Sequence, residues 1–371
     1  IALENLDLWN NQLTTLDVNN NTALITLKAS SNDIIALDVS ANTALTELYC
    51  DNTQLNYLNM RNGVTDELTN FNASNNDLQC IETLDPDYAM ENWTYDNGNI
   101  DEGVTFSIIC DSPELSNWYV DTNGSDEQGA GTAESPFASI QTGINAASSG
   151  DTVSVAAGTY VENISFSGKS ITIIGEDREA TIVDADTSGR AFYFDGESQH
   201  TIAFSGFTIT NGESGHGGGI YITVSIEIDL FDLNVKENNC TGSGGGIYIY
   251  DSMGELTNVD IVNNESTNGS GGGIAMSNSD MILNNVNVID NYARYTSGGA
   301  SFGSDQFDES TTEWTNSVFT GNSCLYNASA IGMGDSTILS NLTVIQNTTE
   351  RCALAGWGNF TITNSIIRDN L

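Results

Sequence analysis

Carboxylates that recur in register are the side chains of this sequence best placed to do chemistry. Asp229 and Glu255 lie one repeat apart. On adjacent coils of a solenoid they would approach the ~5 Å separation of the two carboxyl groups in retaining glycosidases. Weaker groups of the same kind are Asp184 with Asp186, and Asp305 with Asp308 and Glu309. Because the chain carries 50 acidic residues, the competing interpretation is a solvated acidic face on which carboxylates stack by chance.

Two aromatic residues near the N-terminus indicate a binding surface. Trp9 and Tyr49 fall in outward-facing columns of a shorter repeat, together with Asp7 and Asp51. Their rings could stack on a sugar or hold a peptide, so we predict these four residues as ligand-binding. Two aromatics do not make a cluster, and an ordinary solvated face is the alternative.

A short loop has the composition of a calcium site. Asp121, Asn123, Ser125 and Asp126 place oxygen ligands around a glycine, as loops that bind hard cations do. The loop lacks the bidentate Glu at the twelfth position of an EF-hand, and a solvated loop is the alternative. Calcium is the one cofactor that the sequence suggests.

Histidine and lysine give little support for other catalytic chemistry. The sequence around His216 resembles the G-H-G motif of polygalacturonases, but the N-T-D and D-D motifs of that family are absent. At a spacing of 27, His216 shares a column with Ser243, Ser270 and Ser297, which predicts a turn. The positive base of pectate and pectin lyases has no clear counterpart, because Lys169, in GKSITIIG, matches a framework position of that superfamily.

The elements that must position these residues begin with a 21-residue repeat. Segments 2–22, 23–43 and 44–64 align, and a fourth unit follows after a two-residue shift. Asn11, Asn32 and Asn76 hold a bend position where an amide can bond turn backbone. The pattern L-x-x-L-x-L-x-x-N-x-L is that of leucine-rich repeats. We therefore expect residues 1–112 to form a leucine-rich-repeat domain.

The segment from Cys80 to Cys110 resembles the closing cap of leucine-rich repeats in surface proteins of Bacteroidota, which are exported by the type IX route. The resemblance implies a Cys80–Cys110 disulfide, and an exposed repeat end does need a cap. Cys50 is expected as a buried thiol. Cys324 and Cys352 lie on adjacent coils and could pair if the turns allow it. Bridged caps indicate an oxidising, extracellular setting.

Residues 113–371 are expected to form a right-handed parallel β-helix. The stretch 117–175 resembles the opening of secreted β-helices of the pectin-lyase-like superfamily. Within it, Phe137, Ile140 and Ile144 share one face of an expected helix near 135–148, which would cover the open first coil. Because the sequence stops inside a repeat, we expect the β-helix to be truncated at its C-terminal end.

Glycine and asparagine mark the coils of this second repeat. Four glycine-rich runs begin at a spacing of 27, at Gly217, Gly244, Gly271 and Gly298. One asparagine column holds Asn258, Asn285, Asn316, Asn341 and Asn364, with Asp232 one coil earlier. A second holds Asn238, Asn264, Asn291, Asn322, Asn347 and Asn370. Residues one repeat apart would lie about 4.8 Å apart, so we expect amide ladders. These runs also resemble the repeats of polymorphic outer-membrane proteins, a family of surface adhesins.

The charge balance excludes some partners. Nine basic residues against 50 acidic ones give a net charge of −41, so nucleic acid and anionic membrane surfaces are not expected as partners. No apolar run reaches the roughly 18 residues of a membrane span, and we expect no membrane insertion.

Together these patterns predict an all-β solenoid, part of a longer chain that is secreted or lies on a bacterial cell surface. The expected function is non-enzymatic binding or adhesion, with an extracellular glycan or surface protein as partner and secretion or surface machinery as a further one. The alternative is a polysaccharide lyase or glycoside hydrolase acting on extracellular glycans. A groove with converging carboxylates or a bound metal would favour the enzyme, and a smooth face would favour the adhesion protein.

Overall fold

The computed structural model describes residues 2–110, 116–195, 200–223, 226–303, 311–334, 336–356 and 360–371. They divide into two compact units, Ile1–Tyr119 with Asn123–Ala146, and Val120–Thr122 with Ala147–Leu371. The predicted boundary between residues 112 and 113 falls outside the described residues, as do Asp305, Asp308 and Glu309.

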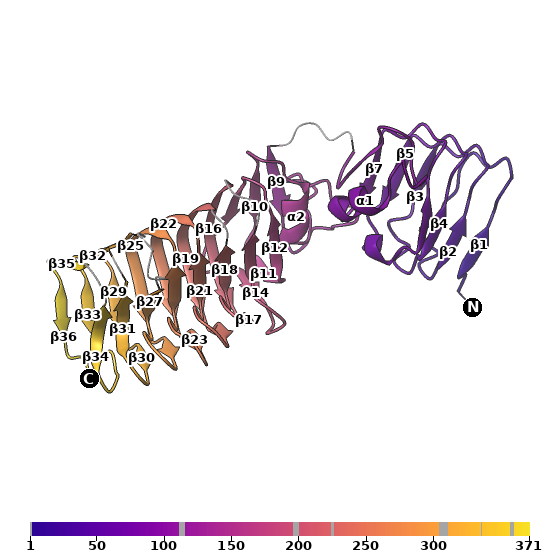
Figure 1. The fold of residues 1–371 in the computed structure, drawn as a ribbon. Helices are drawn as coiled ribbons and strands as arrows, with labels where there is room; N and C mark the ends of the chain where they lie inside the picture. Colours follow the sequence, from indigo (N-terminus) through magenta and orange to yellow (C-terminus); the bar gives the residue numbers. More distant parts are fainter. Residues whose placement is uncertain are drawn as a thin grey trace. The chain divides into compact units, whose positions relative to one another are not determined.

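The N-terminal unit is built from successive coils that form two parallel sheets (Figure 1). One sheet has the order β1 (Asn5–Asp7), β2 (Thr26–Lys28), β4 (Glu47–Tyr49), β6 (Asn70–Asn72). The other has the order β3 (Ala36–Asp38), β5 (Tyr57–Met60), β7 (Cys80–Thr83), β8 (Thr105–Ser107). Leu6, Leu27, Leu48 and Phe71 stand opposite one another in the first sheet. The predicted 21-residue columns are therefore the observed register.

Asparagine stabilises the bend after the first sheet. The Asn32 amide donates to the carbonyls of Leu8 and Ala29 and accepts from the Leu13 N–H. The residue before it, Ser31, has φ 58°. The side chain thus satisfies backbone groups on two adjacent coils where the chain takes a left-handed conformation, as the bend prediction required.

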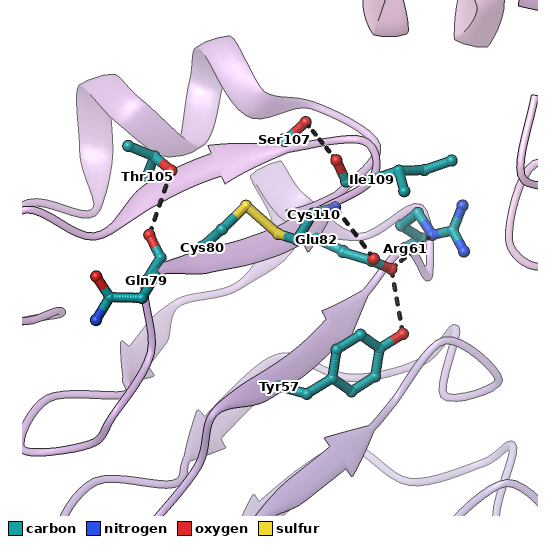
Figure 2. The surroundings of a disulfide bond; sticks show 9 residues. All are labelled: Tyr57, Arg61, Gln79, Cys80, Glu82, Thr105, Ser107, Ile109 and Cys110. Atoms are coloured by element: carbon teal, nitrogen blue, oxygen red, sulfur yellow. Dashed lines mark hydrogen bonds and ion pairs between the residues drawn. A yellow bond between two sulfur atoms is a disulfide. The ribbon is translucent and has the colours of Figure 1, made fainter. Parts of the chain in front are cut away.

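The last coils of this unit are joined by the predicted disulfide. Cys80, at the start of β7, is bridged to Cys110 after β8, with Cα atoms 5.8 Å apart (Figure 2). Between them lies the helix α1 (Pro86–Asn92), capped by the Asp85 side chain, which accepts from the Tyr88 N–H. Trp93 follows and is buried against Phe71, with ring centroids 4.4 Å apart. A short 3₁₀ helix, η1 (Thr65–Glu67), precedes β6.

A buried ion pair lies beside this disulfide. The Arg61 Nε lies 3.3 Å from a Glu82 carboxylate oxygen, and both side chains are buried. Glu82 also accepts from the Tyr57 hydroxyl and the Cys110 N–H (Figure 2). Arg61 donates through Nη1 to the Gly129 carbonyl. Burial raises the pKa of Glu82 above its ordinary value, and the Arg61 charge opposes that rise.

The second unit is a parallel β-helix (Figure 1). Its largest sheet follows the order β10 (Thr152–Val155), β13 (Thr172–Gly175), β16 (Thr201–Thr210), β19 (Glu227–Lys236), β22 (Met253–Val262), β25 (Asp280–Ile289), β28 (Thr312–Thr315), β32 (Thr337–Ser340), β35 (Phe360–Thr363). The same sheet includes β11 (Gly158–Val161), β14 (Thr181–Asp184), β29 (Val318–Thr320), β33 (Thr343–Ile345) and β36 (Ile366–Arg368). The prediction of an all-β solenoid is confirmed.

Two further sheets complete the coils. One has the order β12 (Ile164–Ser167), β15 (Phe192–Asp195), β18 (Ile220–Thr223), β21 (Ile247–Tyr250), β24 (Ile274–Ser277), β27 (Ala300–Gly303), β31 (Ala328–Met333), β34 (Cys352–Gly356). The other has the order β17 (Glu213–Ser214), β20 (Asn239–Cys240), β23 (Glu265–Ser266), β26 (Tyr292–Ala293), β30 (Ser323–Cys324). Inward residues of the three sheets fill the core, where Phe204, Phe207 and Trp314 are fully buried.

The chain between the repeats forms β9 (Asn117–Val120) and one helix, α2 (Ile140–Ala146), inside the predicted range 135–148. Phe137, Ile140 and Ile144 are buried, as their shared face predicts. By its contacts α2 belongs to the N-terminal unit. Its role as a cover for the first β-helix coil stays a prediction.

The second asparagine column forms the predicted ladder. Each amide donates to the next side chain along the solenoid at 2.9–3.1 Å, from Asn238 through Asn264, Asn291, Asn322 and Asn347 to Asn370. Each also donates to a backbone carbonyl of the preceding coil, such as that of Ile261 for Asn291. The first column lies at an exposed corner with positive φ, 56° at Asn285. Its side chains do not form a continuous ladder: Asn285 donates to Asn258, but Asn316 donates to Asn284 instead of Asn285.

The glycine register differs from the prediction in the fourth coil. β24 and β27 pair Ile274 with Ala300, an offset of 26 rather than 27. Ser297, with φ 57°, therefore takes the position of Gly271, and Gly298 moves one place along. The column containing His216 continues to Thr296 instead of Ser297, since Thr296 bridges Ser270. The turn before β27 is one residue shorter, although the glycine run keeps its spacing.

Candidate functional sites

The outer face of the first sheet contains a hollow of about 370 Å³, here called the N-terminal hollow. It is lined by Asp7, Trp9, Lys28, Ser30, Tyr49 and Asp51. All four residues predicted as ligand-binding lie in it. Side chains of a strand alternate between faces, and the register aligns Asp7, Lys28 and Tyr49 across β1, β2 and β4. Lys28 and Ser30 were not predicted, although they occupy the same columns as the predicted residues.

Hydrogen bonds hold the carboxylates of the N-terminal hollow. Asp7 accepts from the Trp9 N–H at 3.1 Å. Asp51 accepts from the Ser30 hydroxyl and from the Asn52 amide. Trp9 is 63% exposed, so its ring is available to a ligand. The Lys28 Nζ lies 5.6 Å from the centroid of the Tyr49 ring, a cation–π contact.

The largest sheet of the β-helix has a second hollow, the acidic groove, of about 610 Å³. It is lined by Glu227, Asp229, Met253, Gly254, Glu255, Asp280, Met281, Ile282, Thr311, Thr312, Glu313 and Ile338. Asp229 and Glu255 are directly opposite each other on β19 and β22, as predicted. Glu227, Asp280 and Glu313 were missed as partners. The two-residue alternation that selects Asp229 also selects Glu227.

The acidic groove can bring two carboxylates to one substrate bond. Its acids are exposed, and Met253, Ile282 and Ile338 provide apolar surface between them. The groove is also the feature that would favour the enzyme over a smooth adhesive face. Asp184 and Asp186 are not part of it: the Asp184 carboxylate accepts from the Asp186 N–H and the Asn211 amide and so holds a turn.

The predicted calcium loop has a structural carboxylate. Asp126 accepts from the N–H groups of Ala138 and Ser139, just before α2. The Ser125 hydroxyl donates to Glu127. Among the described residues, no group of three or more His, Cys, Asp or Glu is placed to hold a metal ion. Calcium at Asp121, Asn123, Ser125 and Asp126 stays a prediction.

The other singled-out side chains have structural surroundings. His216 accepts from the Ser243 N–H at 2.9 Å, within a turn as predicted. Cys50 is a buried free thiol, and burial raises its pKa. Cys324 and Cys352 do not pair: Cys352 is exposed and stands opposite Ala328, whereas Cys324 is buried.

Comparisons of the sequence with known proteins do not assign the chain to a family. No protein-family model matches it. The uncharacterized protein YwoF of Bacillus subtilis (strain 168) is 32% identical over 120 residues, 29% of this chain and 25% of the relative. The chain thus spans about a quarter of that relative's length.

Three of the solved structures that resemble the chain are two pectin methylesterases and a pectate lyase. A mutant pectin methylesterase in complex with a hexasaccharide is 12% identical, covers 71% of this chain and 94% of its own, and has a TM-score of 0.42. A pectate lyase is 13% identical, covers 68% of this chain and 79% of its own, and has a TM-score of 0.43. Pectin methylesterase from carrot is 12% identical, covers 70% of this chain and 84% of its own, and has a TM-score of 0.41. At such scores no activity carries over to this chain. None of the described helices is both long and apolar enough to cross a membrane.

Proposed function

We propose that this chain is a secreted or cell-surface protein that binds an extracellular glycan through the N-terminal hollow. The observation that carries the proposal is that Trp9, Tyr49, Asp7 and Asp51 line one hollow. An exposed indole offers a flat apolar surface to the C–H face of a sugar ring. Carboxylates held beside it accept hydrogen bonds from sugar hydroxyls.

The setting of the site supports the same proposal. The disulfide between Cys80 and Cys110 is typical of an oxidising, extracellular compartment. We assign residues 1–112 to a leucine-rich-repeat domain with a Bacteroidota-type cap, exported by the type IX route. The β-helix would serve as a stalk or display surface, and calcium would bind the loop at Asp121.

The test of the proposal is loss of binding in the Trp9→Ala variant. On a glycan array followed by titration, the full chain binds a glycan, and Trp9→Ala weakens that binding at least about tenfold, as expected for loss of an aromatic anchor. Tyr95→Ala is the matched control, since Tyr95 is 57% exposed in the same unit and outside the hollow. Equal affinity for wild type and Trp9→Ala would rule the hollow out.

Glycoside hydrolysis at the acidic groove is the second candidate, favoured by the pairing of Asp229 with Glu255. One carboxyl group would protonate the leaving oxygen while the other attacks the sugar as nucleophile. A lyase would need a base in the groove, and no described Lys, Arg or His lines it.

This candidate predicts turnover that depends on the pair. If a glycan substrate releases reducing ends with the wild type, Glu255→Gln should lower kcat at least about a hundredfold, because it removes a catalytic carboxyl group. Glu237→Gln, a change of an acid outside the groove, should retain the rate. Full activity in Glu255→Gln would exclude the pair from catalysis.

A further inference from the structure

We infer that the N-terminal hollow takes one or two residues of an uncharged sugar and excludes sugars that carry a carboxylate or sulfate. This inference rests on the proposed function and names the ligand class of the same site. It follows from the charges fixed around the hollow, from where Lys28 lies, and from the size of the space.

The carboxylates of the hollow are fixed and still able to accept. Asp7 uses one oxygen for the Trp9 N–H, so the carboxylate is tied to the same residue that presents the exposed indole. The two oxygens of Asp51 each accept one hydrogen bond, from Ser30 and from Asn52. An ionised carboxylate has about four acceptor positions. Both groups can therefore receive further hydrogen bonds from sugar hydroxyls without moving.

Lys28 does not neutralise these carboxylates by direct pairing. In the register Lys28 lies between Asp7 and Tyr49, and its Nζ lies over the Tyr49 ring. Among the ion pairs of the described residues, none involves Lys28. Two carboxylates against one ammonium leave the lining negative, and the chain as a whole carries −41. An anionic sugar would meet repulsion both at long range and on contact.

The space fits a short ligand. At about 370 Å³ the hollow lies near the lower end of the roughly 300–1,000 Å³ typical of small-molecule sites. Trp9 and Tyr49 both line this space, which has room for a sugar ring or two rather than for a long segment of polymer. A terminal or branch sugar of a larger glycan would fit into this space.

The experiment compares matched sugars on the full chain. Isothermal titration measures the affinity for neutral mono- and disaccharides and for their counterparts in which one sugar is a uronic acid, at fixed ionic strength. The neutral member should bind at least about tenfold more tightly, and the difference should narrow in high salt, which screens charge. Asp7→Asn should raise affinity for the acidic member, whereas Asp77→Asn, a change of an exposed aspartate outside the hollow, should not.

The outcomes separate this inference from the proposed function. Acidic sugars that bind as tightly as neutral ones, with binding lost in Trp9→Ala, would overturn the selectivity and leave glycan binding intact. Absence of binding by any saccharide, neutral or acidic, would overturn both. A preference for neutral over acidic sugars that becomes smaller in Asp7→Asn supports both the selectivity and the proposed glycan binding.

Discussion

Replacing Asn291 by Asp should lower the free energy of unfolding of the β-helix by about 3–5 kcal/mol. Asn291 is fully buried, and its amide donates to the Ile261 carbonyl and to the Asn322 side chain. Aspartate keeps the shape and the acceptors but removes both donors. The Ile261 carbonyl oxygen and the Asn322 side-chain oxygen would then face a buried carboxylate with no hydrogen-bond donor between them, which is costly. Urea unfolding followed by circular dichroism measures the change.

The matched control applies the same substitution at the exposed asparagine column. Asn285 donates to Asn258 at the surface and has φ 56°. Asp tolerates that conformation and already occupies the same column at Asp232. We expect Asn285→Asp to cost less than about 1 kcal/mol, typical of surface changes. If both variants unfolded at the same urea concentration, the inner ladder would not be the stabilising feature.

Replacing Arg61 by Met should destabilise the N-terminal unit by about 3–5 kcal/mol at neutral pH, because it leaves the Glu82 carboxylate buried without its ion-pair partner. Glu82 already has a raised pKa in the folded protein. A carboxyl group whose pKa is higher in the folded than in the unfolded protein adds stability at pH values below its unfolded pKa. That contribution is lost as the pH rises through the folded pKa. Without Arg61 the pKa rises further, so the defect should shrink as pH falls toward the ordinary value of 4.5.

The double variant Arg61→Met with Glu82→Gln tests the origin of this effect. Glu82 accepts from the Tyr57 hydroxyl on one oxygen and from the Cys110 N–H on the other. Glutamine carries no charge and can keep both contacts, because its carbonyl oxygen accepts from the Cys110 N–H while its NH2 group donates to the Tyr57 hydroxyl oxygen. We expect it to recover much of the lost stability and to remove the added pH dependence. Thermal unfolding between pH 4 and pH 8 would show this. A pH-independent defect in Arg61→Met would contradict the role of the buried charge.

The fold could be predicted largely because a solenoid repeats its physical constraints. Leu27 stands opposite Leu6 on one neighbouring strand and Leu48 on the other, so column matching in the sequence is also strand register. The inner asparagine ladder follows for the same reason. The error at Gly298 shows the limit: a glycine run keeps its spacing in the sequence while a turn loses one residue, and only the pairing of Ile274 with Ala300 reveals it.

The sites could be predicted only in part. The outward columns gave Trp9 and Tyr49, and the 26-residue step from Asp229 gave Glu255. Column position alone does not show where a sheet face becomes hollow, so Lys28, Glu227 and Glu313 were missed. The buried pair of Arg61 and Glu82 has no pattern in the sequence, because neither residue belongs to a repeating polar column. Whether Cys324 and Cys352 pair depended on turn geometry, which places one inside and one outside.

Hydrogen exchange of the full chain, with and without a glycan that it binds, tests the central claim most directly. The account predicts added protection at β1, β2 and β4, the strands that carry the N-terminal hollow, and no change in Trp9→Ala. The strands β19, β22 and β25 around the acidic groove should exchange as before. Protection confined to those β-helix strands would contradict the account and place the glycan at Asp229 and Glu255 instead.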